Sequence, residues 1–466
     1  MKLKIDLPTA ATLALGLAVL ACHAQAPDLS KLRPRVEAIP VAEIDRVNQR
    51  SGLATCFWGA TVSPDTFNIL IPDSGVLYWV TQFRLPAGAS LALHGQYPKA
   101  RHISLNSYDA SGQPVDRLND QMLPPDTGST NPFLPGARRD GTKRDYSVRL
   151  VERPVQAGQR VDDATREAGT LVVPQGTALH QLWYRVYVPD QGQDVRGGVA
   201  LPQAVLTFAD GRTLKGEALC KEIVVTQGML NDVRLPAEAL KPLLALKGEG
   251  VRSPYHPAQN PPVWSAFFNS PLSVLNTLIG TPNESIRQRM DTTRRGGFYS
   301  TLDNTYMSSY IDKRHGEVLV LRAKAPTTPR TQQGAAVMQP AQLRYWSLCK
   351  NRSLSDTAVD GCLYDEQVPL DALGRYTMVV SAPASRPANA RAECGVAWLD
   401  WGAVGDGVGN SDGGFLVYRH MMPAADFKQS IFATVKLGEE REVLGEYYPD
   451  SRYMSRAEFE QGGCKR

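Results

Sequence analysis

The chain has 466 residues, of which 42% are hydrophobic and 21% charged, and this balance excludes an intrinsically disordered protein. The length exceeds what one hydrophobic core supports and indicates two or three domains. The formal net charge is only +4 and lysine and arginine form no long run, so we expect no nucleic-acid partner.

The N-terminus has the pattern of an export signal. Two lysines precede an apolar stretch at 13–21 that is too short to cross a bilayer. Two processing routes fit: a lipobox-like sequence that would leave a lipidated Cys22, or cleavage at the Ala-Gln-Ala sequence of 24–26. We therefore expect the protein in the periplasm, tethered to the outer membrane, or outside the cell, with a membrane contact only through a lipid anchor.

The first half of the chain reads as short strands. Runs of β-branched and aromatic residues at 76–80, 102–105, 146–150 and 182–188 are separated by Gly, Pro, Asp and Asn clusters. This rhythm is typical of an all-β sandwich or barrel. The polar loop Asp126–Phe133 either folds over a groove or forms a simple turn.

The middle of the chain changes to a helical pattern. Ala237–Leu246 contains four leucines among good helix formers, and a Pro-rich segment at 254–262 precedes an apolar stretch at 264–279. We predict two short helices packed against the sandwiches, with a linker between them.

The second half repeats motifs of the first half in the same order. The matched segments are 56–59 with 297–300, 71–77 with 311–319, 100–105 with 343–348, 145–148 with 375–378, and 182–189 with 415–423. Five matches in one order indicate two copies of one sandwich. We therefore predict a mainly β protein with two related jelly-roll-like β-sandwich domains and a short helical linker region.

These observations give the domain organisation. The predicted parts are a signal peptide at 1–26, an N-terminal extension at 27–50, a first sandwich at 51–225, a linker with short helices at 226–290 and a second sandwich at 291–466.

The cysteines support an oxidising compartment. Setting aside Cys22 leaves six, an even number in a chain with an export signal. Six cysteines allow many pairings, and the domain organisation favours Cys56–Cys220, Cys349–Cys362 and Cys394–Cys464. Each bridge would add roughly 2–4 kcal/mol of stability.

A family resemblance rests on four motifs of the second half. They are Tyr-Trp-Ser-Leu at Tyr345–Leu348, an Arg-Tyr-Thr strand at Arg375–Ser381, Trp-Leu at Trp398–Leu399, and Phe-Leu-Val-Tyr-Arg in Phe415–Pro423. In this order they resemble a large bacterial family catalogued only as a domain of unknown function. The resemblance implies an exported jelly-roll-like β-sandwich, covers about half of the chain and brings no catalytic residues.

Four arginines lie on motif strands among apolar residues. Arg101 and Arg344 occupy one repeat position, and Arg185 and Arg419 occupy another. An arginine in such a setting needs a partner carboxylate or an anionic ligand. The two alternatives are therefore structural ion pairs and a site for an anion.

Aromatic and histidine residues give further candidates. Asp400 lies between Trp398 and Trp401, where rings can stack on a sugar, and the alternative is that both tryptophans belong to the core. His102 and His420 lie on motif strands and are candidates for acid–base chemistry, with a structural histidine as the alternative.

A glycine-rich loop carries Asp406, Asn410 and Asp412. Hard oxygen ligands of this kind suit calcium, and the alternative is an Asx-rich turn. The loop also spells Gly-x-Ser-x-Gly at 409–413, but no helix is expected after the serine, so a hydrolase nucleophile is not predicted. The adjacent carboxylates at 365–366 are expected to be solvated edge charges. No cofactor other than calcium is predicted.

The sequence favours an exported ligand-binding or structural protein, with a glycan or a small anionic molecule as ligand. The alternative is a hydrolase or lyase that acts on an envelope or environmental polymer between the two sandwiches. The sequence indicates no oligomeric state. The candidate ligand-binding residues are Arg101, Arg185, Arg344, Trp398, Asp400, Trp401, Arg419 and His420.

Overall fold

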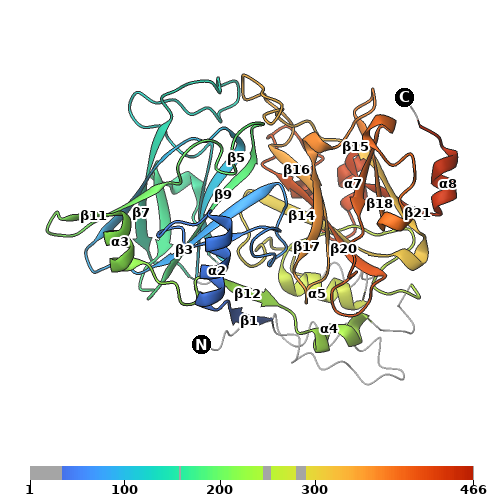
Figure 1. The fold of residues 1–466 in the computed structure, drawn as a ribbon, viewed down its shortest axis with the longest axis horizontal. Coiled ribbons are helices and arrows are strands. Elements are labelled where there is room, and N and C mark those ends of the chain that lie inside the picture. The colour runs from blue at the N-terminus through green and yellow to red at the C-terminus, as the bar shows by residue number, and fades with distance from the viewer. Residues whose placement is uncertain (1–33, 157–158, 245–252, 280–289, 465–466) are drawn as a thin grey trace.

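The computed structural model describes residues 34–156, 159–244, 253–279 and 290–464 (Figure 1). The expected signal peptide, with its lipidation candidate Cys22, lies outside the described residues. Within these ranges, no helix combines the length and the hydropathy needed to cross a membrane.

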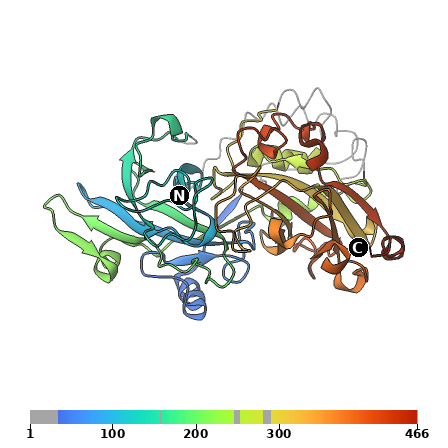
Figure 2. The ribbon, with the colours of Figure 1, turned by 90° about the horizontal axis from the view of Figure 1, so that it is seen from above.

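The protein is mainly β, as predicted, and its sheets form two sandwiches that lie side by side (Figures 1 and 2). One sheet of the first sandwich has the order β2 (Ala60–Val62), β3 (Val76–Phe83), β9 (His180–Pro189), β5 (Ala100–Tyr108) and β6 (Pro114–Asn119). The other has the order β11 (Thr213–Lys215), β10 (Gln203–Thr207), β4 (Ser90–Gln96), β7 (Asp145–Arg153) and β8 (Thr170–Pro174). All neighbours are antiparallel except β7 and β8.

The second sandwich has a matching strand order, except that its second sheet has no strand corresponding to β11. One sheet runs β13 (Ser265–Ala266), β14 (Asn304–Asp312), β20 (Gly413–Met421), β16 (Tyr345–Asn351) and β17 (Val359–Tyr364). The other runs β19 (Val396–Asp400), β18 (Arg375–Ser381), β15 (Val318–Lys324) and β21 (Asp450–Met454), and again one pair, β18 with β19, is parallel.

The segments outside the sheets differ in part from the prediction. The helix predicted at Ala237–Leu246 is present as α4 (Ala237–Leu244). The stretch at 264–279 begins with β13, which pairs with β14, before α5 (Ser270–Ile279). The predicted boundary at 291 is therefore too late, because the second sandwich takes a strand from the predicted linker. The other α-helices of the described residues are α2 (Val41–Ser51), α3 (Gly216–Ile223), α7 (Glu440–Leu444) and α8 (Arg456–Gln461), and β1 (Arg35–Ala38) pairs with β12 (Asn231–Arg234).

Each sandwich buries its own aromatic core between its two sheets. Trp79 and Tyr146 are fully buried in the first core, and Trp346 and Trp401 occupy the second. The three predicted disulfides are confirmed: Cys56–Cys220, Cys349–Cys362 and Cys394–Cys464.

The sheet of β3, β9 and β5 faces the sheet of β14, β20 and β16 of the other sandwich. Every residue of β5 is buried, including the polar residues His102, Ser104 and Asn106. Side chains of one sandwich hydrogen-bond the other here, for example from Tyr345 Oη to Asp73 Oδ1 at 2.9 Å. The layer between the two sandwiches is therefore buried and contains polar groups beside a cluster of apolar and aromatic residues from both sandwiches, and we refer to it as the interlayer.

Candidate functional site

Both facing sheets carry a row of tyrosine, arginine and serine on three adjacent strands. The rows are Tyr78–Arg185–Ser104 in the first sandwich and Tyr306–Arg419–Ser347 in the second. Side chains alternate between the two faces of a strand, so an arginine in the interlayer has apolar neighbours in sequence that point into its own core. This alternation explains why these arginines stand among apolar residues in the sequence.

Arg101 and Arg344 hold the two sandwiches together. Arg101 is fully buried and donates from Nη1 to both carboxylate oxygens of Asp365, at 3.0 and 2.9 Å, while Nη2 binds Glu366. Arg344 Nη1 lies 3.5 Å from Asp120 Oδ2. Burial raises the pKa of Asp365, and the charge of Arg101 acts against this rise. Both arginines are thus engaged in structural ion pairs, which was one of the two alternatives for them.

The carboxylates at 365–366 are not the solvated edge charges that the sequence led us to expect. The chain leaves β17 and turns into a short 3-10 helix over Asp365–Gln367. Because the segment is not a strand, both carboxylates reach Arg101, and their side chains are almost completely buried.

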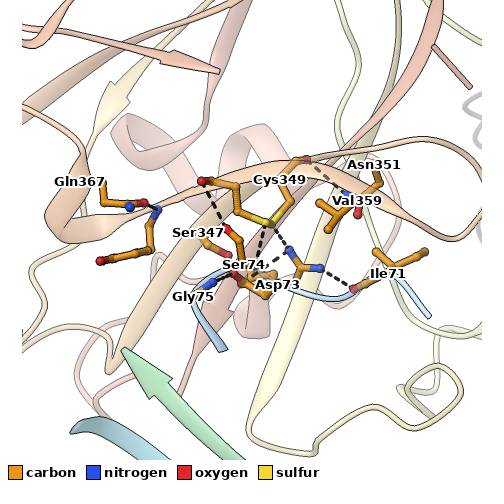
Figure 3. Close-up of a disulfide and its surroundings, with 12 residues drawn as sticks. Ile71, Asp73, Ser74, Gly75, Ser347, Cys349, Asn351, Val359 and Gln367 are labelled. Atoms are coloured by element: carbon orange, nitrogen blue, oxygen red, sulfur yellow. Dashed lines mark hydrogen bonds and ion pairs between the residues drawn. A yellow bond between two sulfur atoms is a disulfide. The ribbon is translucent and has the colours of Figure 1, made fainter. Parts of the chain in front are cut away.

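Arg419 also has a carboxylate partner. Its Nη1 lies 3.7 Å from Asp73 Oδ2, and its Nη2 donates to the carbonyl of Ile71 at 3.0 Å. Nη1 further contacts Cys349 Sγ at 2.7 Å, in the surroundings that Figure 3 shows. Asp73 also accepts hydrogen bonds from Ser347 Oγ at 2.6 Å, from Tyr345 Oη at 2.9 Å and from the main chain of Gly75 at 2.9 Å. Asp73 is therefore the carboxylate that balances the charge of Arg419.

Arg185 has no such partner. It is 1% exposed, and its Nη2 donates to Tyr108 Oη and to the carbonyl of Tyr299, both at 2.6 Å. Its Nε and Nη1 are buried and lack a hydrogen-bond acceptor, and no aspartate or glutamate of the described residues forms an ion pair with it. The guanidinium carbon lies 5.3 Å from the centre of the Tyr78 ring and 5.6 Å from that of Trp183. Arg185 is thus a buried cation surrounded by aromatic rings.

The tyrosines around Arg185 do not supply a negative charge. Burial raises the pKa of Tyr108 to about 12, although the charge of Arg185 acts in the opposite direction. The Tyr108 hydroxyl therefore stays protonated at neutral pH. Burial likewise raises the pKa of Tyr78 and of Tyr306.

Further polar groups of the interlayer have unused hydrogen-bonding capacity. Tyr78 and Tyr306, the tyrosines of the two rows, are partly exposed. The Oδ1 of Asn106, on the strand next to Arg185, is buried without a donor. Of the two row arginines, Arg419 has the carboxylate of Asp73 as a partner and Arg185 has none among the described residues, so the pair of rows carries one unbalanced positive charge. This arrangement can hold a small anion.

The tryptophan pair of the second half does not join this site. Trp401 is fully buried in the second core, so the stacking platform suggested for it is not available, because its ring is covered on all sides. Trp398 donates from Nε1 to Ser381 Oγ at 3.0 Å, and Asp400 accepts from the main chain of Gly402 at 2.9 Å. Both lie on β19, in the sheet that faces away from the first sandwich.

The two candidate histidines lie apart. His420 follows Arg419 on β20, points to the opposite face and accepts a hydrogen bond from the main chain of Ile431 at 3.2 Å. Burial lowers the pKa of His420 to about 3, so its imidazole is neutral. His102 belongs to the interlayer, where its Nδ1 lies 2.7 Å from Asp120 Oδ2.

The calcium candidates are occupied by contacts within their own loop. Asp406 Oδ1 accepts from the main chain of Val408 and of Asn410, both at 2.9 Å. Asn410 Oδ1 accepts from the main chain of Asp412 at 3.2 Å, and Asp412 lies 3.2 Å from the ammonium of Lys313. These contacts are those of an Asx-rich turn, and calcium at this loop stays a prediction.

Another group of potential metal ligands lies beside Arg419. It consists of Asp73, Cys349 and Cys362, whose ligand atoms lie within 4.8 Å of one another. The two cysteines form a disulfide, and the guanidinium of Arg419 contacts both Asp73 and Cys349. A fixed positive charge at this place opposes a cation, so we do not assign a metal here.

The sequence did not identify Tyr78, Tyr108, Tyr306 or Asp73 as site residues. Tyr78 and Tyr306 pair in register with the two arginines. The signal that points to them is the polar alternation of β5 at His102, Ser104 and Asn106, which marks the outer face of that sheet.

Comparisons with known proteins give structural neighbours only. No family model and no curated protein matches the chain. The chain is similar to the crystal structure of an uncharacterised protein from Burkholderia cenocepacia, with 13% identity, a TM-score of 0.45 and 96% of each chain covered. It is also similar to a crystal structure of a protein from Vibrio parahaemolyticus, with 10% identity, a TM-score of 0.37 and coverage of 88% of this chain and 96% of that one. The family resemblance of the sequence stays a prediction.

Proposed function

We propose that this is an exported binding protein that holds a small anionic molecule in the interlayer between its two sandwiches. One observation carries the proposal: Arg185 is buried with two guanidinium nitrogens unpaired and has no carboxylate partner among the described residues.

An unpaired buried charge is unfavourable. Its desolvation costs several kcal/mol, and a cation–π contact with a desolvated ring offsets about 2 kcal/mol or more of that cost. Cation–π contacts also leave the N–H donors of Nε and Nη1 without acceptors. An anion that accepts from Arg185, with the Tyr78 and Tyr306 hydroxyls as further donors, would remove both costs.

Export and duplication belong to the same proposal. The export signal in the sequence and three disulfides support an oxidising compartment outside the cytoplasm. The shared strand order and the matched Tyr-Arg-Ser rows support an internal duplication of one sandwich. Duplication would explain why two like-charged arginines meet between the copies.

A thermal-shift experiment on the mature protein tests the proposal. Sodium acetate, succinate, phosphate and sulfate are each compared with sodium chloride at equal ionic strength. A bound anion stabilises the folded state, so at least one salt should raise the Tm of the unmodified protein by more than about 2 °C. The Arg185→Gln variant should lose this response, and the control Arg212→Gln, at an arginine 60% exposed, should keep it. No response to any salt, or an equal response in Arg185→Gln, would contradict the proposal.

A hydrolase or lyase with its site in the interlayer is the second candidate. It is favoured by the His102–Asp120 pair, because the Nε2 of His102 is buried and lacks a partner. His102 is fully buried, so a polymer would reach it only if the sandwiches separate. Release of new chain ends from a cell-envelope polysaccharide by the unmodified protein, and its loss in His102→Asn, would support this candidate. Equal release of chain ends by the unmodified protein and by His102→Asn would exclude a catalytic role for His102.

A further inference from the structure

The disulfide Cys349–Cys362 differs from the other two in its place in the fold. The two cysteines lie directly opposite each other on the neighbouring strands β16 and β17. Their separation in sequence is 13 residues, whereas Cys56–Cys220 and Cys394–Cys464 join residues 164 and 70 positions apart. A bridge across a short hairpin that is already held by strand pairing constrains the unfolded chain least. The fold therefore depends on this disulfide less than on the others.

Both sulfur atoms receive a hydrogen-bond donor (Figure 3). Arg419 Nη1 lies 2.7 Å from Cys349 Sγ, and the main-chain N–H of Ser74 lies 3.3 Å from Cys362 Sγ. A disulfide sulfur is a weak acceptor, whereas a thiolate is negatively charged and accepts strongly. These donors therefore favour the reduced pair over the oxidised pair, and the carboxylate of Asp73, within 4.8 Å of both sulfurs, acts in the opposite direction.

The two sulfurs differ in their distance from solvent. Cys349 is fully buried, whereas Cys362 is 9% exposed and lies on β17, the last strand of its sheet. Ser74, whose N–H contacts Cys362, is exposed. Cys362 is therefore the less buried cysteine of the pair, and Cys349 is the one beside a guanidinium.

We propose that Cys349–Cys362 is a redox-active disulfide that exchanges with an external dithiol. One thiolate of the dithiol attacks Cys362 Sγ and forms a mixed disulfide, while the bond to Cys349 breaks and its electron pair stays on Cys349 as a thiolate held by Arg419. The second thiol of the reductant then loses its proton and attacks its own sulfur of the mixed disulfide. This attack releases Cys362 as a thiol and leaves the reductant as a cyclic disulfide, so two electrons pass to the protein.

The test is stepwise reduction of the folded protein with dithiothreitol, followed by quenching, alkylation and peptide mapping. Cys349 and Cys362 should be labelled at dithiothreitol concentrations at least tenfold below those that label the other four cysteines. Near-ultraviolet circular dichroism should meanwhile retain the native signal. Reduction of this pair after the others, or only together with unfolding, would overturn the proposal.

Two further measurements test the role of Arg419. Arg419→Met should slow reduction of the pair at least tenfold, and the control Arg322→Met, at an exposed position of β15, should not. Where Arg419→Met does not fold, the unmodified protein in its reduced form serves instead. Its ultraviolet thiolate absorbance should show one cysteine that ionises at least one pH unit below the ordinary thiol range near about 8.5. Ionisation of both thiols in the ordinary range would overturn the role of Arg419.

Discussion

Arg101 and Arg344 each donate a hydrogen bond from Nη1 to the main-chain carbonyl of the other, at 3.3 and 3.4 Å, across the boundary between the two sandwiches. The two arginines lie at matching positions, just inside β5 and just before β16, so the contact is nearly symmetric. The neighbouring pair is not symmetric, because Arg419 has Asp73 as a partner and Arg185 has no carboxylate in the described part of the chain. This asymmetry separates three arginines that have a carboxylate partner from one that has none.

Replacing Arg101 with Met should destabilise the protein strongly. The change leaves Asp365 and Glu366 buried without their cation, and breaking a buried ion pair from one side costs about 3–5 kcal/mol. Urea unfolding followed by tryptophan fluorescence measures the change. The control Arg212→Met, at an exposed site, should stay within about 0.5 kcal/mol of the unmodified protein. A cost for Arg101→Met as small as that of the control would contradict the structural role.

Replacing Gly75 with Ala should loosen the boundary between the sandwiches. An added Cβ would lie 2.5 Å from the hydroxyl of Tyr345, which would have to move away from Asp73. We expect a loss of about 1–3 kcal/mol from this overpacking, measured as a lower urea midpoint. Gly361→Ala is the matched control, because its Cβ would meet Leu399 at an ordinary 3.7 Å. Equal midpoints for the two variants would show that Tyr345 adjusts without cost.

Acid should destabilise the second sandwich through His420. The pKa of His420 is lowered to about 3 by burial, against about 6.5 for an unfolded chain, so the unfolded state binds more protons between these values. The contribution of neutral His420 to the free energy of unfolding is therefore fully present above about pH 6.5, and it is lost progressively as the pH falls towards 3. The loss from this residue at pH 5 is about 2 kcal/mol.

Thermal unfolding between pH 7 and pH 5 measures the effect of His420. The Tm of the unmodified protein should fall more steeply than that of His420→Asn, which removes the titrating group. The exposed His94 provides the control, and His94→Asn should keep the full slope. Parallel slopes in all three proteins would contradict the assignment.

The sequence alone predicted the mainly β class and all three disulfides, because strand rhythm and cysteine parity are local or countable features. It also placed Arg101 and Arg344 at one repeat position, and the structure has Arg101 at the start of β5 and Arg344 immediately before the equivalent strand β16. The match of 71–77 with 311–319 does not fit in the same way. Val76 begins β3 and Val318 begins β15, and these strands hold different positions in their sandwiches. The sequence match therefore paired two aliphatic runs of similar composition that belong to non-equivalent strands.

The candidate site was predictable only in part. Arg185 and Arg419 were candidates because an arginine among apolar strand residues needs a partner. Whether Arg185 or Arg419 lacks a carboxylate partner depends on Asp73. Asp73 lies on a loop of the first sandwich, 346 positions before Arg419 in the sequence. The polar face of β5 reads as solvent-facing, because no local pattern indicates that a second sandwich covers it. The pairing of the arginines and the burial of this face therefore depend on long-range packing, which the local sequence does not predict.

The most direct test of the account is the stability of Arg185→Met without ligand, measured by urea unfolding in a chloride buffer after exhaustive dialysis. The substitution leaves no orphaned acceptor, because the carbonyl of Tyr299 still accepts from Tyr108 Oη at 3.1 Å. We expect Arg185→Met to be at least as stable as the unmodified protein, since a buried unpaired cation is removed. A loss of about 3 kcal/mol or more, as expected for Arg101→Met, would show that Arg185 is a structural residue and would contradict the proposed anion site.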